Sequence, residues 1–77
     1  MTEHELDARR LLCPMPVIRT QNKIRQLTAG DHLTVFCTDP GALHDIPAWC
    51  RIHGHRIIES NSDADEIRIL IEVDGGK

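Results

Sequence analysis

Apolar and polar residues alternate in several segments of the chain, which is the pattern of strands with one face in a protein core. The clearest is residues 66–73, where Ile67, Ile69, Ile71 and Val73 occupy every second position. Residues 31–38 form another such segment, with Cys37 on the inward side. Weaker patterns over residues 4–9 and 55–60 predict two more strands, and the polar residues 61–65 join the last two strands as a hairpin.

A helix is predicted to start near Cys13 and to run to about Leu27. Pro14 and Pro16 suit its first turn, where backbone N–H groups have no partner within the helix, so Cys13 is predicted at or near the N-cap. Apolar residues recur at helical spacing along one side, and Gly30 follows the end. The predicted inward positions are Val17, Ile24 and Leu27.

A second helix is predicted over residues 46–53, after a short turn over residues 40–44. Pro47 removes a hydrogen bond to the preceding turn, so the helix is expected to begin beside it rather than earlier. Gly54 is the predicted C-terminal cap. The order strand, helix, strand, helix, strand, strand (βαβαββ) indicates an α+β fold, a two-layer α/β sandwich with both helices on one sheet face, and residues 1–77 are expected to form a single domain.

Composition narrows the class of function. Of the 77 residues, 40% are hydrophobic and 27% are charged, as in a small folded domain. The formal charge is −3, no basic run occurs, and Phe36 and Trp49 are the only aromatic residues, so we expect protein partners and no direct nucleic-acid binding. Residues 1–10 lack a continuous apolar stretch, so we expect no signal peptide, no membrane segment and a cytoplasmic protein. We also expect a monomer.

Cys13 has the position of a reactive thiol. The chain has three cysteines, and free thiols are their expected state in a reducing compartment. A helix N-terminus carries a positive partial charge that favours a thiolate. Because Pro14 and Pro16 lack an N–H, Met15 alone among residues 14–16 can donate a backbone hydrogen bond there. The pattern leaves open whether Cys13 is reactive or a small buried residue before a helix.

Three arginines lie within a few residues of Cys13. Arg9, Arg10 and Arg19 are candidates for contacts with a bound anion or an acidic partner surface, although the pattern favours a solvated charge for each of them.

The remaining candidates for chemistry lie between residues 37 and 55. Cys37 and Cys50 are expected to pack in the core, because each lies on the inward side of its element. The segment from Cys50 to His55 lacks the paired spacing of a zinc site, so no metal site is predicted and His53 and His55 are interpreted as surface histidines.

Two motifs together resemble the TusA/SirA/YedF family of sulfur carriers. One is Leu12-Cys13-Pro14-Met15-Pro16, and the other is Asp39-Pro40 followed by Asp45-Ile46-Pro47 and Cys50. The resemblance runs from about Leu6 to Val73 and implies a four-stranded mixed sheet with two helices on one face. It also implies that Cys13, positioned by Pro14, Met15 and Pro16, carries sulfur as a persulfide without a cofactor.

The resemblance further implies protein partners. In the family, a cysteine desulfurase or rhodanese supplies the sulfur, and a TusBCD/DsrEFH-type or heterodisulfide-reductase-like protein accepts it. The sulfur serves tRNA thiolation, molybdenum-cofactor biosynthesis or cytoplasmic sulfur oxidation. Whether such a carrier counts as an enzyme, a sulfurtransferase, is partly convention, because its donor and acceptor sites belong to other proteins.

Two other functions remain open at this level. One is a non-catalytic interaction or regulatory module that uses the Cys-Pro-x-Pro turn as a docking shape, with Phe36, Ile58 and Leu70 as a patch on the sheet face away from the helices. The other is a thiol-disulfide redox protein, which is disfavoured because no second cysteine lies near Cys13 in the sequence.

Overall fold

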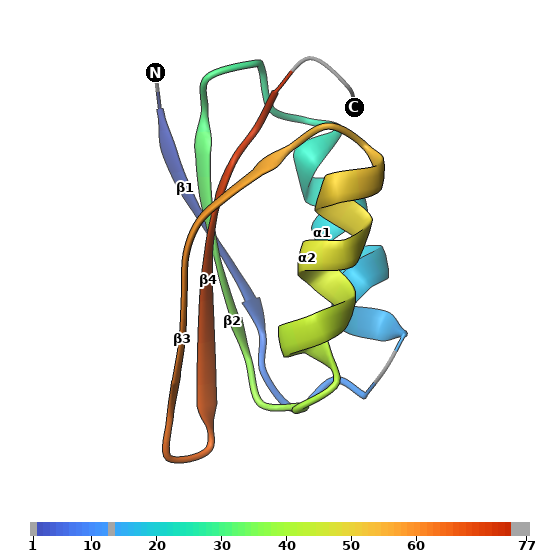
Figure 1. Ribbon diagram of the computed structural model, residues 1–77, viewed down its shortest axis with the longest axis vertical. Helices are drawn as coiled ribbons and strands as arrows, with labels where there is room; N and C mark the ends of the chain where they lie inside the picture. Colours follow the sequence, from blue (N-terminus) through green and yellow to red (C-terminus); the bar gives the residue numbers. More distant parts are fainter. Residues whose placement is uncertain (1, 13, 75–77) are drawn as a thin grey trace.

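The elements follow the predicted order. The computed structural model of the protein describes residues 2–12 and 14–74. Its helices and strands, shown in Figure 1, are β1 (Glu3–Ala8), α1 (Met15–Ile24), β2 (His32–Cys37), α2 (Ala42–Ile52), β3 (Arg56–Asp63) and β4 (Glu66–Glu72). No helix in this described part of the chain is long and apolar enough to cross a lipid bilayer.

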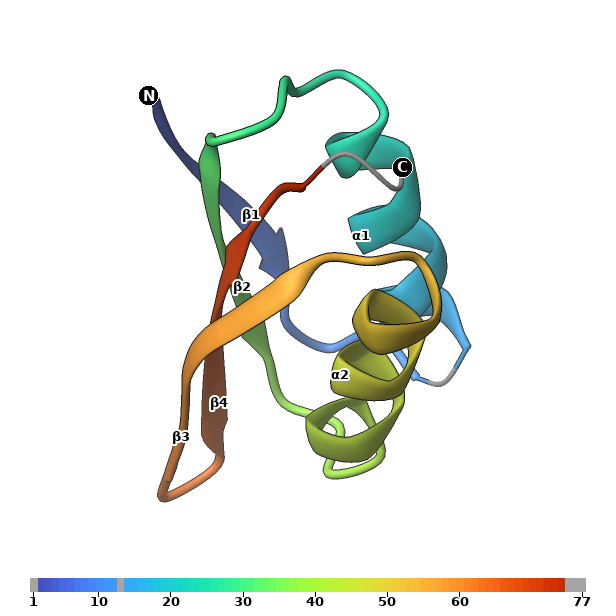
Figure 2. The ribbon, with the colours of Figure 1, turned by 45° about the horizontal axis from the view of Figure 1, so that its top comes forward.

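The sheet has four strands in the order β1-β2-β4-β3. β1 and β2 are parallel, as a strand-helix-strand crossover requires, whereas β4 is antiparallel to both β2 and β3. Both helices lie on the same face of this mixed sheet (Figures 1 and 2). The predicted two-layer α+β fold is therefore confirmed.

Cross-strand pairs of apolar residues form the sheet side of the core. Val35 of β2 stands opposite Ile69 of β4, and Cys37 stands opposite Ile67. Val35, Cys37 and Ile69 are fully buried, and Ile67 is 5% exposed. Since successive side chains of a strand point to opposite faces, these pairs confirm the register that the alternation predicted. The helices complete the core with three residues each: Pro16, Thr20 and Ile24 from α1, and Ala42, Ile46 and Cys50 from α2.

The predicted end of the first helix was wrong by one turn. α1 ends at Ile24, and the next residues form a turn of the 3₁₀ type. In this turn the N–H groups of Gln26 and Leu27 donate to the carbonyls three residues earlier, at Lys23 and Ile24. Leu27 nevertheless stays buried at 4% exposure. Its apolar side chain suggested a longer helix, but a tight turn places the same side chain in the core.

The predicted start of the second helix was also wrong. α2 begins at Ala42 and contains Pro47 in its interior, so the turn at Pro40 and Gly41 leads directly into the helix instead of standing apart from it. A proline there removes one backbone hydrogen bond. Ala42, Ile46 and Cys50, spaced by four residues, are all fully buried. Burial of this continuous apolar stripe against the sheet favours one helix despite the missing bond.

The hairpin between β3 and β4 is tighter than its polar sequence suggested. β3 continues to Asp63, so the expected connection over residues 61–65 shrinks to Ala64 and Asp65. Asn61 pairs with Arg68, and Ser62 pairs with Ile67. Hydrogen bonding to β4 thus extends β3 through residues of low strand propensity. Ala64 adopts a left-handed φ of 54° to close the turn.

Gly54 ends α2 in the predicted way. Its φ is 82°, a conformation that glycine adopts without a Cβ penalty. The Gly54 N–H donates to the Arg51 carbonyl at 3.3 Å, and the His55 N–H donates to the Cys50 carbonyl at 2.8 Å. This pair of bonds is a Schellman motif, which satisfies carbonyls at the helix end and turns the chain toward β3.

Gly54→Ala is expected to lower the free energy of unfolding by about 1–2 kcal/mol, the cost of an L side chain in the left-handed region. Gly54→Asn should lose less, because Asn tolerates this conformation. Urea unfolding followed by circular dichroism measures both variants. Equal losses in the two would show that the left-handed backbone is not the source of the cost.

Candidate functional site

The chain on both sides of Cys13 lies at the molecular surface. Cys13 itself lies outside the described residues. Leu12 is 75% exposed, Met15 is 38% exposed, and Pro14 is also exposed. Single exposed apolar residues are common, but several that adjoin one another indicate a contact surface.

The N-cap of α1 is Pro14, with φ −94° and ψ 14° and no side-chain hydrogen bond to cap the helix. The prediction that Cys13 lies at or near the N-cap concerns a residue outside the described ranges. The Met15 N–H, the donor that the sequence left for a thiolate, donates instead to the Leu12 carbonyl at 2.8 Å. Residues 14–16 therefore offer a neighbouring thiolate the partial charge of the helix end rather than a free N–H.

Pro16 anchors the start of α1 in the core. It is among the fully buried side chains of the protein, and Thr20, one turn later, is 0% exposed. The Thr20 hydroxyl donates to the Pro16 carbonyl at 2.8 Å. Val17, which the sequence pattern predicted on the inward face, is partly buried and packs against the core. The spacing of four residues between Pro16, Thr20 and Ile24 could have predicted the buried face of α1. This spacing was missed because Thr is more often exposed than buried.

The other two cysteines are buried, as predicted. Cys37 and Cys50 are both 0% exposed. Burial raises the pKa of the Cys50 thiol to about 12, and burial together with the negative charge of Asp39 raises the pKa of Cys37 to about 11. Because the thiolate is the nucleophile, we expect both to react slowly near neutral pH in the folded protein.

Arg9 is held on the sheet side of the molecule rather than at the start of α1. Its guanidinium bonds both carboxylate oxygens of Asp7, at 2.9 and 3.1 Å, and lies 3.6 Å from Glu66. Hydrogen bonds from Arg9 lower the pKa of Asp7 to about 2. Its guanidinium carbon also lies 6.0 Å from the centre of the Phe36 ring.

Arg10 and Arg19 are placed differently from each other. Arg10 has a left-handed φ of 68°, and its N–H donates to the Thr38 hydroxyl at 2.8 Å, which fixes the chain between β1 and the Cys13 segment. Arg19 is exposed on α1, one helical turn after Met15. The structure thus does not gather the three arginines into one group, and Arg19 is the one that shares α1 with the Pro-Met-Pro segment.

The histidines near Cys50 pack around an aromatic ring. Trp49 stacks on His53 at 4.5 Å and on His55 at 5.5 Å between ring centres. His55 was interpreted as a surface histidine, but it is only 5% exposed, and its Nδ1 accepts the Asp74 N–H at 3.0 Å. Across residues 2–12 and 14–74, no group of three or more His, Cys, Asp or Glu side chains is placed to hold a metal ion.

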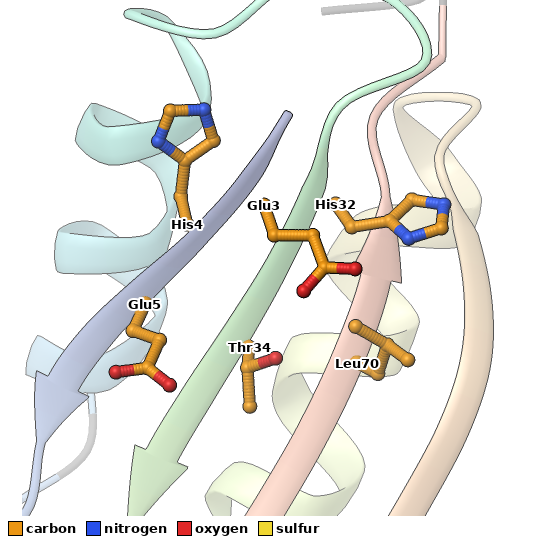
Figure 3. A pocket seen from close by; sticks show the side chains of 6 residues that line it. All are labelled: Glu3, His4, Glu5, His32, Thr34 and Leu70. Carbon is orange, nitrogen blue, oxygen red and sulfur yellow. The ribbon is translucent and has the colours of Figure 1, made fainter. Parts of the chain in front are cut away.

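A hollow of about 490 Å³ lies on the sheet face away from the helices (Figure 3). Glu3 and Glu5 of β1, with His32 and Thr34 of β2, form most of its rim, and Leu70 of β4 closes it. The hollow lies at the start of β1, far along the strand from the segment that leads to Cys13. Its rim is acidic, so it does not favour an anionic sulfur species.

The apolar patch expected on this face is interrupted by charge. A register shift in β3 places Glu59 opposite Leu70, where an unbroken register would place Ile58. Phe36 and Leu70 line a second shallow hollow together with Glu5, Glu59 and Arg68. Charged residues therefore interrupt the apolar patch that the sequence suggested for Phe36, Ile58 and Leu70.

Comparison with known proteins identifies the family. A family model described as Sulfurtransferase TusA matches residues 4–73. The chain belongs to the TusA family. YrkI of Bacillus subtilis, provisionally named a sulfur carrier protein, is 39% identical over 67 residues, which cover 87% of this chain and 89% of YrkI.

Two further comparisons extend this result. YrkF of Bacillus subtilis, also provisionally named a sulfur carrier protein, is 33% identical over 70 residues. These residues cover 91% of this TusA-family chain and 38% of YrkF. A solved structure of a SirA-like protein from Desulfitobacterium hafniense has the same fold, with a TM-score of 0.81 over 94% of this chain and 99% of that one. At 24% identity, that likeness supports the fold alone.

Native alkylation should leave Cys37 and Cys50 unmodified while Cys13 reacts. Burial and the raised pKa of each thiol should slow their reaction by about a hundredfold or more relative to the protein unfolded in urea. Peptide mass analysis after timed iodoacetamide treatment, with and without urea, measures each site. Modification of Cys37 in the folded protein as fast as in urea would contradict the register of β2.

Pro16→Ala should lower both the stability of the protein and the pKa of Cys13. Loss of buried ring atoms is expected to cost about 1–2 kcal/mol of unfolding free energy. The restored N–H in the first turn adds a donor that favours a nearby thiolate. The rate of Cys13 alkylation across a pH series gives its pKa, and a pKa equal to or above that of the unaltered protein would show that Pro16 serves packing alone.

Proposed function

We propose that this protein carries sulfane sulfur as a persulfide on Cys13 and passes it to a cysteine of an acceptor protein. The observation that carries the proposal is the burial of the other two thiols, Cys37 and Cys50, both 0% exposed and both with a raised pKa. A sulfur carrier needs a thiol that partner proteins can reach. Of the three cysteines, Cys13 is the one flanked by exposed residues, Leu12 and Pro14.

The proposed transfer is a thiolate-persulfide exchange. The Cys13 thiolate attacks the terminal sulfur of a donor persulfide, a new S–S bond forms at Cys13, and the donor S–S bond breaks with its electron pair returning to the donor cysteine as a thiolate. The terminal sulfur and its proton thus move together, and no external oxidant or cofactor enters the step. The same exchange then runs from Cys13 to the acceptor thiolate.

Pro14, Met15 and Pro16 position the carrier residue in this proposal. Pro16 is fixed in the core and the Met15 N–H is bonded to the Leu12 carbonyl, so the segment has a defined shape next to Cys13. With no free N–H from residues 14–16, the thiolate is stabilised only moderately. That suits a relay, because a thiol whose pKa is strongly lowered is also a weaker nucleophile.

The proposed donor is a cysteine desulfurase or a rhodanese, and the proposed acceptor is a TusBCD/DsrEFH-type or heterodisulfide-reductase-like protein. The delivered sulfur would serve tRNA thiolation, cofactor biosynthesis or sulfur oxidation in the cytoplasm. Membership of the TusA family supports a donor and an acceptor in general terms.

Cys13→Ser should abolish sulfur loading and leave the fold intact, because the substitution removes the proposed nucleophile at the surface. Cys50→Ala, which removes a buried thiol, should still load. Intact mass after incubation with inorganic polysulfide should show one added sulfur, removed by dithiothreitol, in the unaltered protein and in Cys50→Ala. Retention of that adduct in Cys13→Ser would refute the assignment, and a mass lower by two hydrogens would indicate a disulfide instead.

A further inference from the structure

The outer face of α1 combines exposed apolar residues with positive charge. Met15 and Ile18 are 38% and 41% exposed, and Leu12, just before the helix, is 75% exposed. Arg19 lies on the same side, because residues three and four apart are neighbours on a helix. These four residues are called the α1 docking surface; Met15, Ile18 and Arg19 lie on the helix face opposite the buried stripe of Pro16, Thr20 and Ile24.

The charge of α1 is one-sided. The helix and its C-cap carry Arg19, Lys23 and Arg25 and no carboxylate. Among the ion pairs of the described residues, none involves these three cations. Their charge is therefore available to an external partner rather than neutralised within the molecule.

The sheet face away from the helices has the opposite charge. The strands carry the carboxylates of Glu3, Glu5, Asp7, Glu59, Asp63, Glu66 and Glu72. Against them stand Arg56 and Arg68 on the strands, together with Arg9, which is already bonded to Asp7. Since α1 and the far face of the sheet lie on opposite sides of the molecule (Figure 2), a chain with a net charge of −3 presents a basic helix on one side and an acidic sheet face on the other.

We propose that the α1 docking surface binds the protein that donates sulfur to Cys13, at an apolar depression of the donor that is rimmed by carboxylates. The inference rests on the proposed function, since it places the donor beside the carrier cysteine. Leu12, Met15 and Ile18 fill the depression, and Arg19 meets the acidic rim. Charge complementarity selects this occupant: an acidic surface is attracted by α1 and repelled by the sheet face.

The surface has a direct consequence for the transfer step. Two sulfur atoms must come into contact for a persulfide to be exchanged, so the docking contacts must surround Cys13. Apolar side chains on both sides of the cysteine exclude water from that contact, while the cations orient the approaching protein over a longer range. Association should consequently slow as ionic strength rises, because screening weakens the attraction to α1.

The test compares a donor that must dock with one that need not. A purified persulfide-forming protein, a cysteine desulfurase with L-cysteine or a rhodanese with thiosulfate, represents the first kind, and inorganic polysulfide represents the second. Ile18→Ser and Arg19→Glu should each load from the protein donor about tenfold or more slowly. Both should load from polysulfide at the rate of the unaltered protein, and Arg19→Glu should show a weaker salt dependence with the protein donor.

Matched variants on the other layer control for net charge and for loss of apolar surface. Arg68→Glu changes the net charge as Arg19→Glu does, and Ile58→Ser removes an isoleucine that is 46% exposed on β3. Both should load from the protein donor at close to the unaltered rate. Thermal unfolding of all four variants verifies that each is folded at the assay temperature.

The outcomes separate this inference from the proposed function. If the unaltered protein fails to load from polysulfide, the carrier function itself is refuted. If it loads from polysulfide but no faster from either protein donor, or if Arg19→Glu and Arg68→Glu behave alike, the α1 docking surface is refuted and the carrier function stands. Selective loss in Ile18→Ser and Arg19→Glu with the protein donor alone supports it.

Discussion

Both helices pack against the same face of the sheet, and this one-sided core constrains every other feature of the molecule. The buried pairs of β2 and β4, such as Val35 with Ile69, can be covered only if each helix turns an apolar stripe toward them. Most charged residues then lie on the outer side of the helices or on the far face of the sheet, whereas a few polar residues such as Thr20 and His55 are buried. The separation of basic and acidic surfaces follows from this arrangement together with the placement of charges along the chain.

The same packing links stability to the candidate site. Pro16 is buried among the core residues, and its carbonyl accepts the Thr20 hydroxyl, so the first turn of α1 is held by the core. Leu12, Met15 and Ile18 remain exposed on the outer side of that turn, although their hydrophobicity alone favours the core. A relay between proteins needs this combination, because the carrier segment must keep its shape while its side chains contact a partner.

The local environment gives different roles to side chains of the same type. Cys37 and Cys50 act as small core residues whose pKa is raised by desolvation. Arg9 is tied to Asp7 and Glu66, whereas Arg19 is without an ion pair among the residues described. Membership of the TusA family indicates sulfur transfer in general, and these local environments are the basis of our proposal that Cys13 and α1 perform it.

Local pattern alone predicted the strands, the inward position of Cys37 and the two-layer arrangement, because side-chain periodicity depends on neighbouring residues. The Cys-Pro-x-Pro motif, together with the Asp39-Pro40 and Asp45-Ile46-Pro47 segment, indicated the family. Contacts between distant residues decided what local preference could not: burial of an apolar stripe carried α2 through Pro47, and pairing with β4 extended β3 to Asp63. His55 is covered because Trp49 stacks on it. The exposure of a side chain depends on which elements pack over it, and that is a property of the assembled fold rather than of the residue or its sequence neighbours.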